Sequence, residues 1–273
     1  MSLLSLAAQV CNVFGADGDN ALRMVQKVKD DQARDVVSAL DQRLHATAAA
    51  YVVDCMPGCS LLSEEGAASG DGLAALAQGE WLVVDPLDGS NNYVLSLPGY
   101  GFMAAYVVGG VVAGSVVVLP EHDIYLVFEC GELLMSQPFA PPAAAASAPI
   151  YYAYPPRLSE AGRRARAELL DLVDRRSAGL YRYGSACIGA YNLLRGRHRA
   201  FIGHNVRVWD ALAYFPLLDW FRLPARYHLG ASGLTLIAGF DEEFVDEACT
   251  VISANEAITF EAVARETKLV IST

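Results

Sequence analysis

The fold of this chain is decided by one stretch, Trp81-Leu-Val-Val-Asp85-Pro-Leu-Asp88-Gly-Ser90-Asn-Asn-Tyr93. Its first four residues are apolar and predict a buried strand, which the proline and glycine that follow are expected to end. Asp85 and Asp88 stand three residues apart. We therefore expect both carboxylates at the carboxyl end of that strand.

The residues after the carboxylates predict an anion-binding turn. Ser90 is a suitable N-cap for a short helix that begins at Asn91. The N–H groups of that first turn are able to hold an anion such as phosphate. A carboxylate pair that binds a hard cation beside such a helix end indicates metal-assisted phosphoryl chemistry. An ordinary aspartate-rich turn has the same sequence, and the stretch alone does not decide between the two.

Composition favours a globular protein without a nucleic-acid partner. The chain has 273 residues, of which 53% are hydrophobic, enough for one large domain or two fused lobes with a substantial core. Its formal net charge of −11 argues against nucleic acid, because phosphate backbones need a basic surface. A small phosphorylated substrate stays compatible with this charge, since a bound metal ion can reverse the local field.

The cysteines and the apolar segments predict a cytoplasmic protein that does not cross a membrane. The six cysteines are scattered, and only Cys55 and Cys59 lie close together. Buried thiols of a reducing compartment are favoured over a zinc site. Residues 1–9 lack a basic region and predict a helix, not a signal peptide. Residues 102–119 carry no charge, but Gly109-Gly110 divides them into two Val-rich runs, which predicts a β-hairpin and not a membrane span.

Apolar spacing along the rest of the chain predicts alternating helices and strands. Helices are expected at 3–28 (one or two), 38–54, 159–177, after 186, from 209 and at 240–254. Strands are expected at 59–62, 123–128, 132–135, 150–154, 180–183, 200–202, 225–228, 233–238 and 258–261. This order indicates a layered α/β or α+β fold. The Ala/Pro-rich segment 138–149 predicts a boundary between an N-terminal lobe, 1–140, and a C-terminal lobe, 141–273.

Carboxylates stand at the ends of several predicted elements: Asp41 opens a helix, Glu64 ends a strand, Asp85 and Asp88 end the next, and Asp210 opens a later helix. If they converge, only cations could stabilise the cluster, because like charges a few ångströms apart repel strongly. Ligation by oxygen alone favours Mg²⁺ or Mn²⁺ over zinc.

Several motifs occur in a characteristic order and spacing: Asp35-Val-Val-Ser-Ala-Leu-Asp41, Glu64-Glu65, Asp85-Pro-Leu-Asp88-Gly-Ser90, Gly184-Ser185-Ala186 and Trp209-Asp210. With them the sequence resembles the inositol monophosphatase superfamily of Mg²⁺-dependent, Li⁺-sensitive phosphatases, from about residue 5 to the C-terminus. The resemblance implies an αβαβα sandwich of the inositol monophosphatase and fructose-1,6-bisphosphatase type. Most metal ligands would lie in the N-terminal lobe, and Asp210 would complete the site from the C-terminal lobe.

The resemblance also implies the roles of individual residues. Glu64, Asp85 and the Leu87 carbonyl would hold one Mg²⁺ ion; Asp85, Asp88 and Asp210 would hold a second; a third, looser ion would also use Glu64. The catalytic residues implied are Asp41, Ser90 and Glu64, of which Asp41 and Ser90 would position and deprotonate the attacking water. The substrate-binding residues implied are Gly89, Ser90, Asn91, Gly184, Ser185, Ala186 and Asp210.

The implied reaction is in-line attack of metal-activated water on a phosphomonoester of a small polyol or sugar. The chain departs from inositol-specific members around the leaving alcohol. Gly203 stands seven positions before Asp210, where those members carry an acidic residue, and Asn91 replaces the usual Thr. Leu218-Asp219-Trp220-Phe221 replaces the usual Glu-Ala-Gly-Gly. The substrate wall is therefore rebuilt, and the resemblance does not assign inositol as the substrate.

Other interpretations stay open. A fructose-1,6-bisphosphatase or a 3′-phosphonucleotide phosphatase shares the metal core, and a catalytically weak binding or regulatory relative is a further alternative. The family is often dimeric, and we expect the apolar hairpin to supply a homodimer interface. His204 and Lys29 fit either a substrate contact or a surface loop. The basic run 195–199 is expected at a solvated helix end.

Overall fold

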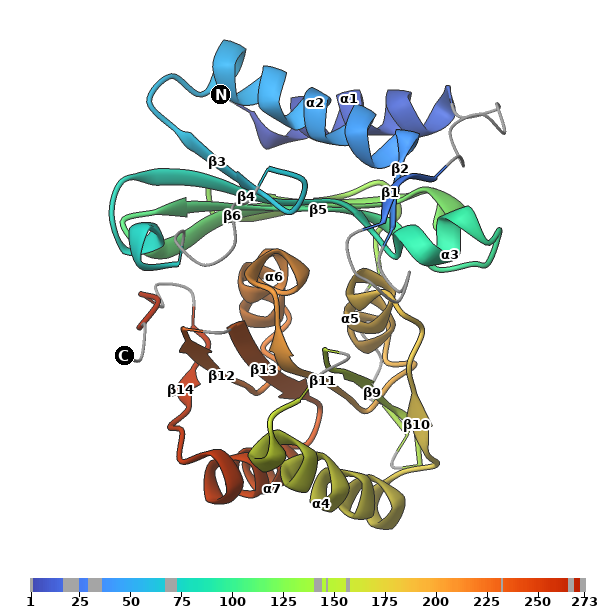
Figure 1. The fold of residues 1–273 in the computed structure, drawn as a ribbon, viewed down its shortest axis with the longest axis vertical. Helices are drawn as coiled ribbons and strands as arrows, with labels where there is room; N and C mark the ends of the chain where they lie inside the picture. Colours follow the sequence, from blue (N-terminus) through green and yellow to red (C-terminus); the bar gives the residue numbers. More distant parts are fainter. Residues whose placement is uncertain are drawn as a thin grey trace.

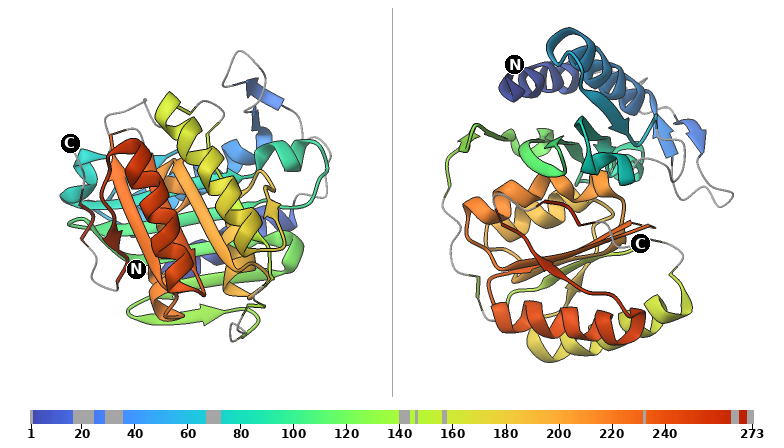
Figure 2. Two further views of the ribbon diagram at one scale, coloured as in Figure 1. Left: turned by 90° about the horizontal axis from the view of Figure 1, so that it is seen from below. Right: turned by 90° about the vertical axis from the view of Figure 1, so that its left-hand side faces the viewer.

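The computed structural model describes residues 2–16, 25–28, 36–66, 73–139, 144–145, 147–155, 158–231, 233–264 and 268–270. These residues stack in five layers: helices α1 and α2, a first sheet, helices α5 and α6, a second sheet, and helices α4 and α7 (Figure 1). The side view in Figure 2 shows the same order of layers. The αβαβα sandwich expected from the sequence is confirmed.

The helices are α1 Leu3–Gly15, α2 Ala39–Cys55, α3 Ser90–Val94, α4 Glu160–Arg176, α5 Ala186–Leu194, α6 Phe215–Trp220 and α7 Glu242–Glu256. Short 3₁₀ turns are η2 Ala74–Ala77, η3 Pro120–His122, η4 Val208–Asp210 and η5 Leu212–Tyr214. The strands are β1 Val25–Val28, β2 Val36–Ser38, β3 Ser60–Ser63, β4 Glu80–Asp88, β5 Gly101–Val108, β6 Val111–Leu119, β7 Ile124–Glu129, β8 Glu132–Met135, β9 Ile150–Ala153, β10 Leu180–Tyr181, β11 Ala200–Val206, β12 Ala225–Gly230, β13 Gly233–Gly239 and β14 Glu261–Ala262.

The first sheet has the strand order β3-β4-β5-β6-β7-β8, in which β3 runs parallel to β4 and the other pairs are antiparallel. The predicted hairpin is confirmed, because β5 and β6 pair across Gly109 and Gly110, both at positive φ. None of the described helices is long and apolar enough to cross a membrane. Helices α1 and α2 cover one face of this sheet, where Leu6, Leu44 and Val84 are buried in one core.

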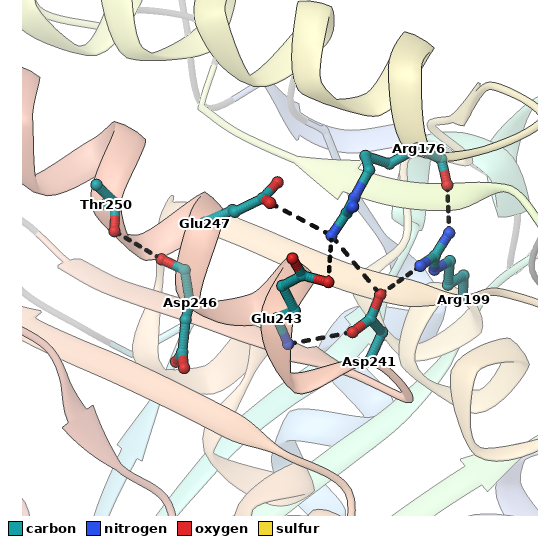
Figure 3. Close-up of polar contacts among 7 residues, drawn as sticks. All are labelled: Arg176, Arg199, Asp241, Glu243, Asp246, Glu247 and Thr250. Atoms are coloured by element: carbon teal, nitrogen blue, oxygen red, sulfur yellow. Dashed lines mark hydrogen bonds and ion pairs between the residues drawn. The ribbon is translucent and has the colours of Figure 1, made fainter.

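The second sheet has the order β10-β9-β11-β13-β12-β14, and its strands β10, β9 and β11 are parallel. Helices α4 and α7 lie side by side across its outer face (Figure 2). An ion-pair network joins their ends to β11 (Figure 3). Asp241, the N-cap of α7, accepts from Arg199, and Arg176 at the end of α4 lies 3.2 Å from Glu243.

One apolar core lies between the two sheets. It contains Met103 from β5, Leu193 from α5 and Leu236 from β13, all buried. The first sheet is formed by residues before the Ala/Pro-rich segment, and the second by residues after it. The two predicted lobes therefore meet in a common core.

Two local predictions are wrong. The helix expected to continue to residue 28 is replaced by Val25–Val28, a strand that pairs antiparallel with Val36–Ser38. Periodicity does not separate a short apolar run in a helix from one in a strand, and pairing with β2 decides here. The cysteines form no disulfide, as expected, but Cys130 is exposed and not buried.

Candidate active site

Strand β4 carries two carboxylates into the interior. It does not end at Pro86 as predicted but continues to Asp88, with an irregular register against β5 between Asp85 and Asp88. Proline lacks an N–H donor, and an irregular step in the ladder is where a strand tolerates it. Asp85 and Asp88 are consequently buried, with 2% and 7% of their surface exposed.

The turn after β4 depends on Gly89. Its φ of 84° lies in the left-handed region, and a Cβ there would stand 2.6 Å from the Gly99 carbonyl oxygen. Gly89 is the N-cap, and helix α3 begins at Ser90. The prediction of Ser90 as the N-cap is therefore wrong by one residue, because the backbone has to turn at the glycine.

Asp88 is held by the start of helix α5, which also lines the cavity. Its carboxylate accepts from Ser185 Oγ at 2.6 Å, from Ala186 N at 3.0 Å and from Cys187 N at 2.6 Å. The exposed N–H groups and the positive dipole end of a helix stabilise a negative charge there. These bonds tie the end of β4 to the layer between the sheets and fix the orientation of Asp88.

Glu64 and Asp210 approach the same region from other elements. Glu64 follows β3, which is parallel to β4, and its N–H donates to the Val84 carbonyl at 3.1 Å. Asp210 lies in turn η4, and its Oδ2 accepts from the Arg207 N–H at 3.1 Å. Burial raises the pKa of Asp210 well above its usual value, and the negative charges of Glu64 and Asp88 raise that pKa further. The carboxylates are therefore close enough to repel one another.

These side chains line one cavity of about 640 Å³. The structure brings all the site residues predicted from the sequence to this cavity, except Asp41: they are Glu64, Asp85, Leu87, Asp88, Gly89, Ser90, Asn91, Gly184, Ser185, Ala186 and Asp210. We call Glu64, Asp85, Asp88 and Asp210 the carboxylate wall. Three of its members precede the Ala/Pro-rich segment 138–149, and Asp210 follows it.

Asp41 does not line the cavity. It is buried in the first turn of α2, where its Oδ2 accepts from the backbone N–H of Ser38 at 2.7 Å and from the Ser38 hydroxyl at 2.6 Å. This is the capping box expected from the sequence, with aspartate in place of glutamate. The structure shows no hydrogen bond between the two described residues Asp41 and Ser90. The capping role of Asp41 is thus observed, whereas its role toward water stays a prediction.

The residue types of the carboxylate wall fit a divalent cation. The donors are oxygens only, which suits Mg²⁺ or Mn²⁺, and a cation would relieve the repulsion that raises the pKa of Asp210. Among the residues that the structure describes, no three His, Cys, Asp or Glu side chains converge closely enough to hold one ion. The chemistry of the donor set therefore fits, while the side-chain positions do not define where an ion binds.

Sequence reasoning missed three further residues that line the cavity. Tyr154, Arg182 and Arg207 line it, and each follows one of the parallel strands β9, β10 and β11. The predicted strands ended close to these positions, and the carboxyl ends of parallel strands meet at one edge of a sheet. The signal was therefore present, but using it required knowledge that these three strands are parallel neighbours.

The structure also places the ambiguous basic residues. His204 is fully buried away from the cavity lining, between the Tyr152 hydroxyl at 2.9 Å and Glu256 Oε1 at 2.6 Å. It is neither a substrate contact nor a surface-loop residue. In the basic run, His198 is buried and Arg199 pairs with Asp241, so the prediction of a solvated helix end is wrong there. Lys29 lies outside the described residues.

Comparisons with known proteins agree with this architecture. The sequence model of the inositol monophosphatase family matches residues 4–219. The inositol-1-monophosphatase SuhB of Mycobacterium tuberculosis is 28% identical over 215 residues, which cover 74% of this chain and 71% of SuhB. The extragenic suppressor protein suhB from Bartonella henselae has a similar fold, with a TM-score of 0.72 and 19% identity over 91% of this chain and 96% of that chain. An IMPase/NADP phosphatase complexed with Mg²⁺ and phosphate gives a TM-score of 0.70 and 18% identity over 94% and 95% of the two chains.

Proposed function

The chain belongs to the inositol monophosphatase family, and on that premise we propose that it is a Mg²⁺-dependent phosphatase that hydrolyses a phosphomonoester of a small polyol or sugar. One observation carries the proposal: four carboxylates, supplied by the segment after β3, by β4 and by η4, line one cavity, beside the backbone N–H groups at the start of α3. A phosphomonoesterase needs positive charge and oriented donors around the reacting phosphate. Oxygen ligands for cations and a helix start supply both.

The Mg²⁺ assignment is supported by the donor chemistry and by the related IMPase/NADP phosphatase that was crystallised with Mg²⁺ and phosphate. Glu64, Asp85, Asp88, Asp210 and the Leu87 carbonyl would hold two or three ions. When bound, a divalent cation supplies charge to the phosphate oxygens and lowers the pKa of a bound water.

In this scheme the chain's own groups bind the phosphate and orient the attacking water. The N–H groups of Gly89 and Ser90 are suited to donate to a phosphate oxygen, and the Ser90 hydroxyl lines the cavity where the attacking water would be oriented. The start of helix α5 fixes the orientation of Asp88 through three hydrogen bonds. Water then displaces the alcohol from phosphorus, so the products are an alcohol and inorganic phosphate.

The identity of the leaving alcohol is less constrained than the type of reaction. The sequence placed the main departure from inositol-specific relatives at Gly203, and this residue is buried within β11, paired with Ala153 and Leu236. It presents no carboxylate to a polyol. A phosphorylated sugar is therefore favoured over inositol 1-phosphate, although the mycobacterial relatives carry inositol-1-monophosphatase as their name. A bisphosphatase is the second candidate, favoured by the arginines that line the same cavity as the carboxylate wall.

The test is phosphate release from a panel of sugar, polyol and nucleotide phosphomonoesters, with Mg²⁺, with EDTA, and with Li⁺ added to the Mg²⁺ reaction. We expect activity that requires Mg²⁺ and falls with Li⁺. Full activity in EDTA would refute the metal-dependent mechanism. No activity on any phosphomonoester would favour a binding protein.

The matched variants are Glu64→Gln in the cavity and Glu168→Gln on the exposed face of α4. Only the first should lower activity, by more than about 100-fold, because it removes a proposed ligand. Equal effects of both variants would contradict the assignment. The homodimer and the cytoplasmic location stay predictions, and light scattering of the purified protein tests the first.

A further inference from the structure

The cavity that the carboxylates line is also lined by two arginines. Tyr154 follows β9, Arg182 follows β10 and Arg207 follows β11, and all three line the cavity. The strands are parallel neighbours, in the order β10-β9-β11, so the chain segments after them leave the sheet at one edge. We call these three residues the arginine wall.

Arg182 is held in place by Tyr154. Its guanidinium lies 4.0 Å from the centroid of the Tyr154 ring, and its Nη2 donates to the Tyr154 carbonyl at 3.0 Å. Arg166 of α4 lies over the same ring at 5.2 Å. Stacking on an aromatic ring restricts the side chain and leaves part of the guanidinium edge for an anion. Arg182 is thus partly preorganised for binding.

Arg207 is positioned by a break in β11. The register against β13 is irregular between Gly203 and Val206, and Asn205 within it has a φ of 52°, which is left-handed. Such a bulge redirects the chain and is frequent beside active sites. The Arg207 N–H then donates to Asp210 Oδ2 at 3.1 Å, which ties the arginine wall to the carboxylate wall.

Neither guanidinium group lies within ion-pair distance of a carboxylate in the described part of the chain, although the charge of Arg207 acts on Asp210 and lowers its pKa. Other arginines there do form ion pairs: Arg226 lies 3.0 Å from Glu242, and Arg199 pairs with Asp241. A planar guanidinium binds a phosphate or carboxylate through two parallel hydrogen bonds. Two such groups on one wall of a cavity therefore favour an anionic ligand group there.

We propose that the substrate carries a second anionic group, a phosphate or a carboxylate, which Arg182 and Arg207 bind while the reacting phosphate lies at the carboxylate wall. This inference rests on the phosphatase activity proposed above. A cavity of about 640 Å³ has the size of an ordinary small-molecule site, which leaves room for a sugar between the two anions. Arg182 and Arg207 are specificity-determining residues in this scheme, because they act at a distance from the reacting phosphorus.

The experiment compares kcat/KM for substrates that differ in one group. On a sugar scaffold these are glucose 1-phosphate, glucose 1,6-bisphosphate and glucuronic acid 1-phosphate. On a nucleoside scaffold they are adenosine 3′-monophosphate and adenosine 3′,5′-bisphosphate. We expect the enzyme to prefer the two-anion member by about tenfold or more, since a charge-assisted contact contributes at least that factor. The sugar series separates a second phosphate from a carboxylate.

The variants are Arg182→Gln, Arg207→Gln and their combination, with Arg175→Gln on the exposed face of α4 as the control. The combined variant should lower kcat/KM for the two-anion substrate by about 100-fold and for the one-anion substrate by much less. The loss should fall mainly on KM, because the contacts are equal in the ground and transition states. Arg175→Gln should change neither value. Circular dichroism checks that the variants fold.

The outcomes separate the two proposals. Hydrolysis of one-anion and two-anion substrates at equal efficiency, or an unchanged preference in the combined variant, would overturn the second-anion inference and leave the phosphatase assignment intact. Hydrolysis of no phosphomonoester at all would overturn both.

Discussion

The two walls of the cavity are built in different ways. The carboxylate wall takes Asp85 and Asp88 from one strand that is buried in the sandwich, and backbone N–H groups hold Asp88 and Asp210. The arginine wall takes one residue from the end of each of three strands, and its two arginines are exposed. The first wall is therefore buried or half-buried, whereas the arginines of the second are open to solvent.

This difference separates the residues proposed to carry out hydrolysis from those proposed to select the substrate. Cation binding needs carboxylates held against their mutual repulsion, which only a buried, hydrogen-bonded frame provides. Recognition of a distant substrate group needs only a few side chains at a rim, and these can change without loss of the core. We therefore expect substitutions in the carboxylate wall to affect activity on every substrate, and those in the arginine wall to affect discrimination.

The largest expected effect is that of Asp210→Asn. The amide keeps an acceptor for the Arg207 N–H but removes a charge that Glu64 and Asp88 repel. We expect kcat/KM with Mg²⁺ to fall by more than about 100-fold on all substrates. The melting temperature of the metal-free protein should be unchanged or higher. Asp174→Asn on α4 is the control, and a fall of less than tenfold would place Asp210 outside the chemistry.

The second effect is a change of stability with pH, which comes from the buried residue His198. His198 stacks against Tyr151, Tyr181 and Tyr183, and burial lowers its pKa to about 4. An unfolded histidine has a pKa of about 6.5, so the folded state binds the proton less readily. Stability from neutral His198 is therefore complete above pH 6.5 and declines as the pH falls toward 4, by on the order of 3 kcal/mol.

Urea unfolding of the wild type and of His198→Gln between pH 7 and pH 4 measures this decline. The wild type should lose more stability than the variant over that range. Parallel curves for the two proteins would show that His198 is not buried in its neutral form.

The smallest effect comes from a hydrogen bond that positions Asp88. Ser185 caps α5 and donates to Asp88 Oδ2 at 2.6 Å, whereas Ser159 caps α4 far from the cavity. Replacement of either serine by alanine should cost about 1 kcal/mol of stability. Only Ser185→Ala should also lower kcat/KM, by about tenfold, because Asp88 loses a positioning partner. Equal kinetics in the two variants would show that the backbone N–H groups suffice to orient Asp88.

Local features were predictable from the sequence. The helix that Asp41 opens and the Gly109-Gly110 hairpin depend on neighbours within a few residues. Features that depend on distant partners were missed. Strand β4 continues past Pro86 because its register against β5 is irregular there. His204 is buried because its partners Tyr152 and Glu256 approach it from other elements of the fold.

The sequence by itself determined which side chains are available: the carboxylates of the strand ends, the glycine that permits the turn at residue 89, and the helix caps. The order and spacing of the sequence motifs sufficed to indicate the family, because each motif is a short run of neighbouring residues. Tertiary structure alone decided which residues share the cavity. It brought Arg182 and Arg207 to the same cavity as Asp85 and Asp88, since strand order and direction fix which chain ends meet. Strand pairing and burial act between residues far apart in sequence, so no local pattern records them.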